Sequence, residues 1–126
     1  MRLLLDTVAF IWAMTSADRM SNKAMAALRS EATLREISVV SLSEVAIKQS
    51  IGKLRIGKDE VLTGIADLRL RVLPYTANHA LHLFDLPAHH GDPFDRQIIA
   101  QALCEKIAVL TSDQKFSLYK GLRIVW

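Results

Sequence analysis

The sequence predicts an α/β fold with a mainly parallel sheet, and three observations lead to this prediction. Short apolar segments alternate with segments of helical periodicity from one end of the chain to the other. The apolar segments are continuous rather than alternating, as expected for strands that are covered on both faces. The chain has no internal repeat, low-complexity tract or linker, so the alternation belongs to one unit joined by right-handed crossovers.

The length and composition agree with a single domain, which we expect to span residues 1–126. Apolar residues make up 51% of the chain and charged residues 23%, which excludes a disordered protein. The single cysteine, Cys104, cannot form an internal disulfide, so the fold needs no oxidising compartment. No apolar run approaches the ~20 residues of a membrane helix or the shorter run of a signal peptide. We therefore expect a soluble cytoplasmic protein.

The continuous apolar segments predict the strands, in chain order, at residues 2–5, 37–40, 71–75, 107–110 and 122–125. The segments of helical periodicity predict helices at residues 7–14, 22–29, 42–51, 59–70, 78–84 and 94–106. Ser21 and Asp59 are the expected N-caps of the second and fourth helices, and Gly52 is the expected stop of the third. The last helix is the clearest, because Ile98, Ile99, Ala102 and Leu103 form its apolar stripe.

Four acidic residues fall where these strands end or the next helix begins. Asp6 directly follows the first strand, Glu44 follows the second and Asp113 follows the fourth. Asp95 opens the helix that leads into the fourth strand. Binding sites in open α/β sheets form outside the carboxyl ends of the strands, so these acids are expected to converge. Clustered carboxylates repel one another unless a cation neutralises them, and oxygen-only ligands suit Mg²⁺ or Mn²⁺.

Each acid also has an interpretation as a helix cap, because helix N-termini favour carboxylates. Asp6 and Asp113 can each cap the turn that follows, and the segment from Ser41 to Glu44 has the pattern of a capping box. Taken one at a time, the acids at the strand ends are explained by capping. The sequence therefore carries two hypotheses for them, a metal site and a set of caps.

Asp92 and Asp95 are distinguished by their positions in the last helix. Asp92 precedes Pro93, which favours the first helical position, so Asp92 is the expected N-cap. Asp95 then falls at the third helical position, on the face of Ile98 and Ile99 that looks into the core. An acid at the rim of a core needs a partner. Asp95 is therefore the acid for which the sequence itself favours a site.

Four stretches of the chain form an ordered set of motifs: Leu3-Leu4-Leu5-Asp6-Thr7, Ser41-Leu42-Ser43-Glu44-Val45-Ala46-Ile47-Lys48, Asp92-Pro93-Phe94-Asp95-Arg96-Gln97-Ile98-Ile99-Ala100-Gln101-Ala102 and Val109-Leu110-Thr111-Ser112-Asp113. In order and spacing, over almost the whole chain, they resemble the PIN-domain ribonucleases. Among these the sequence is similar to the VapC-type toxins of type II toxin–antitoxin pairs. One departure is Val8, where many relatives place a histidine after the Asp-Thr pair.

The resemblance implies a three-layer αβα sandwich with a mainly parallel sheet of four to five strands, and a homodimer. It implies that an Mg²⁺ or Mn²⁺ ion is held by the four acids Asp6, Glu44, Asp95 and Asp113. The implied activity is metal-dependent hydrolysis of RNA phosphodiester bonds, and the implied partner is a cognate antitoxin protein that covers the site. On this hypothesis the hydroxyls that hydrogen-bond the ligands or a bound water belong to Thr7, Thr111 and Ser112.

Other protein classes fit the sequence less well or differ in kind. Haloacid-dehalogenase-type phosphatases carry a second acid where this chain has Val8, and receiver domains need an acid pair near the end of the first strand. The alternative from a different class is a non-catalytic interaction domain of PIN-like fold whose acids only cap helices. The four histidines lack a cysteine pair, so we expect them on the surface or in loops rather than on zinc; they are His79, His82, His89 and His90.

The net charge of +3 agrees with the metal hypothesis once the acids are placed. The chain has 16 basic and 13 acidic residues, so if a cation neutralises four of the acids, the rest of the chain has an excess of seven positive charges. A basic body of this kind suits a polyanionic substrate such as RNA.

Overall fold

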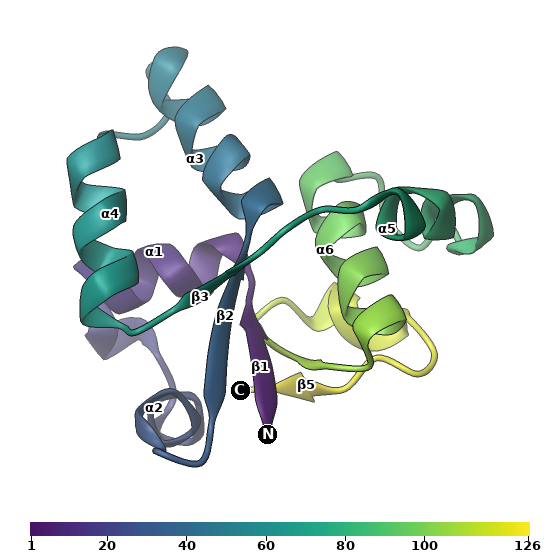
Figure 1. Ribbon diagram of the computed structural model, residues 1–126, viewed down its shortest axis with the longest axis horizontal. Helices are drawn as coiled ribbons and strands as arrows, with labels where there is room; N and C mark the ends of the chain where they lie inside the picture. The colour runs from purple at the N-terminus through teal and green to yellow at the C-terminus, as the bar shows by residue number, and fades with distance from the viewer.

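A parallel sheet of five strands forms the middle layer of the computed structural model, which describes residues 1–126 (Figure 1). The strands are β1 (Arg2–Leu5), β2 (Leu34–Ser38), β3 (Arg71–Leu73), β4 (Ala108–Leu110) and β5 (Ile124–Val125). Their order across the sheet is β3-β2-β1-β4-β5, and all neighbouring strands are parallel. The predicted fold class is therefore confirmed.

Helices cover both faces of this sheet. The α-helices are α1 (Thr7–Thr15), α2 (Asn22–Arg29), α3 (Val39–Ser50), α4 (Lys58–Asp67), α5 (Ala77–His82) and α6 (Pro93–Glu105). Three short 3₁₀ helices complete the fold: η1 (Ala17–Arg19), η2 (Leu83–Asp85) and η3 (Gln114–Leu118). In Figure 1, α1, α2 and α4 lie on one side of the sheet, and α5 and α6 lie on the other. None of the helices is long and apolar enough to cross a membrane.

The alternation of strand side chains divides the core into two parts. Leu3 and Leu5 of β1 pack with buried residues of α1 and α2, whereas Leu4 packs with Ile98 and Ile99 of α6. Successive side chains of a strand point to opposite faces, so a strand covered on both sides must be apolar at every position. All three of these leucines are 0% exposed, and the predicted three-layer αβα sandwich is confirmed.

The boundary between β2 and α3 differs from the prediction. The sequence predicted a strand at residues 37–40, but β2 ends at Ser38 and α3 begins at Val39. The Ser38 side chain accepts a hydrogen bond from the Val40 amide and caps the helix. Val39 and Val40 are β-branched and apolar, which favours strand locally, but they form the first helical turn. Ser41 consequently lies inside the helix, so the predicted capping box at Ser41 is wrong.

The other helix ends follow local signals to different degrees. Asp92 caps α6 by accepting a hydrogen bond from the Asp95 amide, and Pro93 is the first helical residue, as predicted. Gly52 has a φ of +77°, in agreement with its predicted role as the stop of α3. The N-cap of α4 is Gly57 rather than Asp59, because Glu60 accepts a hydrogen bond from the Gly57 amide at 3.1 Å.

The order of the strands reverses next to β1, and the candidate site lies at this reversal. The chain proceeds from β1 outward to β2 and β3, and then returns to place β4 on the other side of β1. The carboxyl ends of β1 and β4 thus form the topological switch point, where α/β proteins bind ligands. The Asp6 amide donates a hydrogen bond to the Leu110 carbonyl at 3.1 Å and joins these two ends.

Two helices that carry predicted site acids are joined beside this point. The Ser38 hydroxyl at the start of α3 donates a hydrogen bond to the Gln101 side chain of α6. The Gln101 amide group in turn donates to the Pro74 carbonyl at 3.2 Å. Both Ser38 and Gln101 are fully buried, so α3 and α6 are held at a fixed separation above the sheet.

Candidate metal centre

Asp6 lies at the switch point and is almost completely buried, with 4% of its surface exposed. Its Oδ1 accepts a hydrogen bond from the Ala9 amide at 2.7 Å, so it caps α1. Burial raises the pKa of Asp6 to about 6, and the nearby charges of Asp113 and Glu44 act in the same direction. The Thr111 hydroxyl and the Ala9 amide oppose this rise without cancelling it. The Asp6 carboxylate is therefore held where its negative charge is unfavourable.

Asp113 reaches the same place from the end of β4. Its Oδ1 accepts a hydrogen bond from the Lys115 amide at 2.9 Å and caps η3, and its own amide donates to the Thr111 hydroxyl. Asp6 and Asp113 are thus both caps, as one hypothesis predicted. Each cap occupies one carboxylate oxygen, which leaves the second oxygen of each residue for another partner.

Glu44 comes from the second turn of α3 and is 5% exposed. Its Oε2 forms an ion pair with Lys48 at 2.5 Å, which is the expected pairing of residues four apart in a helix. Its Oε1 is buried and has no hydrogen-bond partner. Buried carboxylate oxygens are rarely left without a partner, so this oxygen is the clearest sign of a missing ligand.

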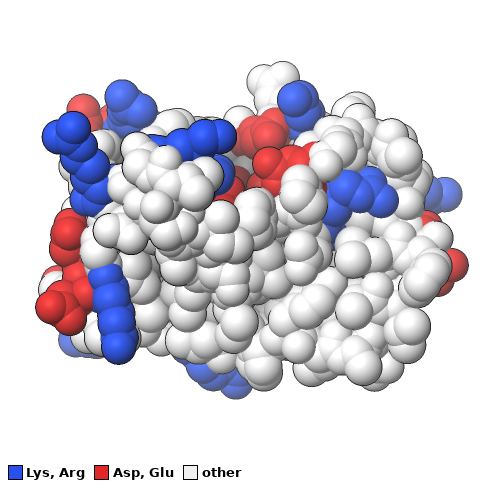
Figure 2. Space-filling view, turned by 90° about the horizontal axis from the view of Figure 1, so that it is seen from above, with Lys and Arg blue, Asp and Glu red and all other residues white.

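Asp95 completes the group from the first turn of α6, with 22% of its side chain exposed. Burial raises the pKa of Asp95 to about 7, and the charges of four other acids add to the effect: Asp92, Asp6, Glu44 and Asp113. All three other predicted ligands therefore act electrostatically on Asp95. Seen from above, acidic side chains gather in a hollow of the surface, with Lys and Arg side chains around it (Figure 2).

The chemistry of this acid cluster, defined as Asp6, Glu44, Asp95 and Asp113, fits a divalent cation. Carboxylate oxygens are the ligands of Mg²⁺ and Mn²⁺, and a cation would relieve the repulsion among them. No three His, Cys, Asp or Glu side chains already surround one point as ready ligands. Binding would therefore draw the carboxylates inward from positions at which they now repel one another. Their assignment as metal ligands stays a prediction supported by burial and charge.

Comparison with known proteins places the fold in a family. The family model of the PIN domain matches residues 3–122. The chain belongs to the PIN domain family. The family expected from the sequence motifs is thereby confirmed.

Solved structures share the fold of this PIN domain at low sequence identity. A chain of VapBC2 from Rickettsia felis, in complex with a fragment of promoter DNA, has a TM-score of 0.75 and 18% identity, and the alignment covers 98% of this chain and 97% of that one. DNA-bound VapBC from Salmonella typhimurium has a TM-score of 0.69 and 21% sequence identity, and the alignment covers 98% of this chain and 96% of that one. FitAcB from Neisseria gonorrhoeae has a TM-score of 0.60 and 19% identity, and the alignment covers 97% of this chain and 95% of that one. No protein of curated function matches the sequence.

The hydroxyls predicted to support the ligands of this PIN domain have different roles. Thr111 lies beside Asp6, and its hydroxyl accepts a hydrogen bond from the Asp113 amide. Thr7 instead donates a hydrogen bond to the Ser41 hydroxyl at 2.9 Å, because its side chain is turned toward α3. Ser112 is exposed, and its hydroxyl has no hydrogen bond to a ligand. Of the three, Thr111 contacts members of the acid cluster, and the role of these hydroxyls toward a bound cation stays a prediction.

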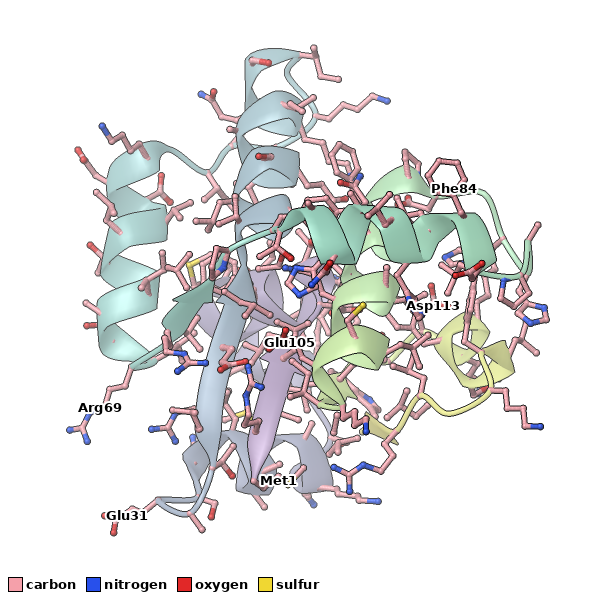
Figure 3. All side chains as sticks on the ribbon, turned by 45° about the vertical axis from the view of Figure 1, so that its right-hand side comes forward. Met1, Glu31, Arg69, Phe84, Glu105 and Asp113 are labelled. Atoms are coloured by element: carbon pink, nitrogen blue, oxygen red, sulfur yellow. The ribbon has the colours of Figure 1, made fainter.

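One histidine of the PIN domain, His79, is buried in a helix, contrary to the expectation of surface or loop positions. His79 is 2% exposed and contacts Glu105, which lies over the strands at the end of α6 (Figure 3). His90 is on a loop, but its side chain is only 8% exposed, and its Nε2 lies 3.6 Å from Asp95 Oδ2. The sequence signal for His90 was its place two residues before Asp92, the cap of the helix that carries Asp95.

Arg96 is the second residue whose role the sequence did not indicate. Its guanidinium donates hydrogen bonds to the carbonyls of Pro87 at 2.8 Å and Leu86 at 3.2 Å. Arg96 therefore holds the loop that precedes α6 against the body of the PIN domain.

Proposed function

We propose that this PIN domain is an Mg²⁺- or Mn²⁺-dependent endoribonuclease and the toxin of a type II toxin–antitoxin pair. The observation that carries the proposal is the gathering of four sequence-distant carboxylates near the switch point of the sheet, two of them (Asp6 and Glu44) buried, with Glu44 Oε1 left without a partner. PIN domain proteins are generally nucleases, so family membership supports the same chemistry.

The four acids would hold the cation by moving inward on binding, and other groups of the chain already constrain three of them. The Ala9 amide orients Asp6, the Lys115 amide orients Asp113, and Lys48 balances part of the charge of Glu44. When bound, the cation supplies an activated water and stabilises charge on the phosphate and the leaving oxygen. Without it, the raised pKa values of Asp6 and Asp95 favour proton uptake at these carboxylates, and those protons leave on binding.

The surface around the acid cluster favours a polyanion. Lys and Arg side chains surround the acidic hollow in Figure 2, and the chain as a whole has 16 basic residues. Basic groups around a cleft attract nucleic acid over several ångströms, while the cation neutralises the carboxylates at the centre. We therefore propose RNA as the substrate, hydrolysed at its phosphodiester bonds.

The proposed partner is a cognate antitoxin that covers the site. The three structural relatives described above are two VapBC structures, both with DNA bound, and FitAcB. By this likeness we propose that the chain works with an antitoxin in the cytoplasm and forms a homodimer.

Expression in a bacterial host tests the proposal. Wild-type protein should arrest growth, and Asp6→Asn should not, because asparagine keeps the cap but removes a ligand charge. Asp18→Asn, an exposed acid of η1, is the matched control and should arrest growth like the wild type. In vitro, cleavage of RNA should require Mg²⁺ or Mn²⁺ and stop with a chelator. Full activity of purified Asp6→Asn would refute the assignment.

The second candidate function is a non-catalytic interaction domain whose acids cap helices. The caps made by Asp6, Asp92 and Asp113 favour it. Capping does not explain Glu44, which is in the second turn of α3, or Asp95, which lies inside α6. A cap-only protein would gain no stability from Mn²⁺, whereas a carboxylate site would gain stability with metal concentration.

A further inference from the structure

Three side chains outside the acid cluster, those of His90, Tyr119 and Arg96, form a connected group next to Asp95. Its central member is His90, whose Nε2 is buried, lacks a hydrogen-bond partner and lies 3.6 Å from Asp95 Oδ2. The other ring nitrogen, Nδ1, is 2.6 Å from the Tyr119 hydroxyl. A buried ring nitrogen that faces a carboxylate without any other partner indicates a specific relation between the two groups.

The donors around Tyr119 determine which nitrogen of His90 carries the proton. Arg96 Nη1 lies 3.3 Å from the Tyr119 oxygen, and a guanidinium group can only donate. The Tyr119 oxygen thus accepts from Arg96, and its own O–H is left to donate to His90 Nδ1. Because Nδ1 is then the acceptor, the proton of the neutral ring is on Nε2, and the N–H faces Asp95.

This arrangement is anchored in the core and not in solvent. Tyr119 is 2% exposed and belongs to the core between the sheet and α6. The rings of Tyr119 and Phe116 flank His90 at centroid distances of 5.5 and 6.2 Å. Arg96 also donates hydrogen bonds to the carbonyls of Leu86, Pro87 and His90 itself, so the loop that carries the ring has little freedom to move.

We propose that His90 is a positioning residue for Asp95, and that Tyr119 and Arg96 fix the tautomer it needs. These three residues are called the His90 relay. By facing one carboxylate oxygen with an N–H, the relay orients Asp95 so that the other oxygen is presented to the cation. Partners of this kind, one step removed from the metal, set ligand orientation and affinity. The role toward a cation rests on the proposed function, whereas the tautomer of His90 does not.

The tautomer is tested by ¹⁵N NMR of the imidazole rings in metal-free protein at a pH where free histidine is neutral, about 8. Wild-type His90 should show a single Nε2–H form. Tyr119→Phe, which removes one hydroxyl and keeps the ring, should give a mixture of both forms. Tyr75→Phe is the matched control, because the Tyr75 hydroxyl has no partner, and it should leave His90 unchanged. An Nδ1–H form in the wild type would overturn the relay.

The role of the relay is tested by calorimetric titration with Mn²⁺. Tyr119→Phe and His90→Asn should weaken Mn²⁺ binding about tenfold, and His90→Gln should recover part of it, because its amide nitrogen reaches the place of Nε2. His89→Asn is the control, since His89 is exposed and only makes an edge-to-face contact with the Tyr119 ring, with the ring centroids 4.9 Å apart. The positioning role would be refuted if Tyr119→Phe and His90→Asn both bound Mn²⁺ with the affinity of the wild type. Failure of the wild type to bind Mn²⁺ would refute the proposed function, while the tautomer still decides whether the relay exists.

Discussion

Replacing Asp6 by asparagine separates the two roles that the structure gives this residue. Asparagine is as good an N-cap as aspartate, so the hydrogen bond from the Ala9 amide is retained. The negative charge, which is buried beside Asp113 and Glu44, is removed. In metal-free protein we therefore expect Asp6→Asn to be more stable than the wild type at neutral pH.

The magnitude follows from the pKa of Asp6. Burial raises this pKa from 3.8 to about 6, so ionisation of Asp6 opposes folding. The opposing free energy begins to accumulate as pH rises above the unfolded value and is complete above the folded value. Since one pKa unit corresponds to about 1.4 kcal/mol, the limiting advantage of Asp6→Asn is about 3 kcal/mol. The advantage should be absent below pH 3.8 and complete from about pH 7.

Urea denaturation followed by circular dichroism measures this difference. Both proteins are unfolded in the presence of a chelator at about pH 4 and about pH 8, with Asp18→Asn as the control for loss of an exposed charge. The reasoning is refuted if the two proteins are equally stable at the higher pH, or if the difference does not depend on pH. Added Mn²⁺ should reverse the order, because only the wild type keeps the full ligand set.

Three further predictions address other parts of the molecule. Glu44→Gln should abolish metal-dependent RNA cleavage and leave the circular dichroism spectrum unchanged; cleavage at the wild-type rate would contradict the role of its unpartnered oxygen. Mn²⁺ affinity should rise with pH through the pKa of Asp95, about 7, because bound protons compete with the cation; calorimetry at a pH on either side gives the sign. Gly64→Ala should destabilise the fold by about 1 kcal/mol or less in thermal melts, because its Cβ would meet the end of the flexible Met14 side chain, which can move aside, and because alanine favours a helix interior over glycine by about 0.5–1 kcal/mol. Gly91→Ala, where a Cβ meets nothing within 4 Å, is the control and should melt near the wild-type temperature.

Local signals predicted the parts of the fold that short-range forces control. The start of α6 was predicted because Asp92 and Pro93 satisfy the first turn within three residues. The boundary between β2 and α3 was misplaced because the β-branched pair at Val39 and Val40 favours strand locally. The Ser38 cap and its hydrogen bond to Gln101, 63 residues away, favour helix there. The strand preference of the two valines can be read from the sequence, whereas the hydrogen bond to Gln101 can be seen only once the chain is folded.

The candidate site shows the same division. The capping interpretation of Asp6 and Asp113 was correct, and so was the expectation that they lie near Glu44 and Asp95. A cap uses one carboxylate oxygen, so capping and clustering do not exclude each other. From the sequence they were treated as competing explanations, although the predicted parallel strands already placed the acids at one edge of the sheet, and the observed register agrees.

Local sequence patterns predicted the order of strands and helices, most of the caps and the four acids proposed as ligands, since these depend on residues near one another in the chain. The folded chain was needed to show that Glu44 Oε1 lacks a partner, that His90 faces Asp95 and that Arg96 holds a loop. The physical reason is that burial and desolvation depend on the residues packed around a group. These come from distant parts of the sequence, and no local pattern records them.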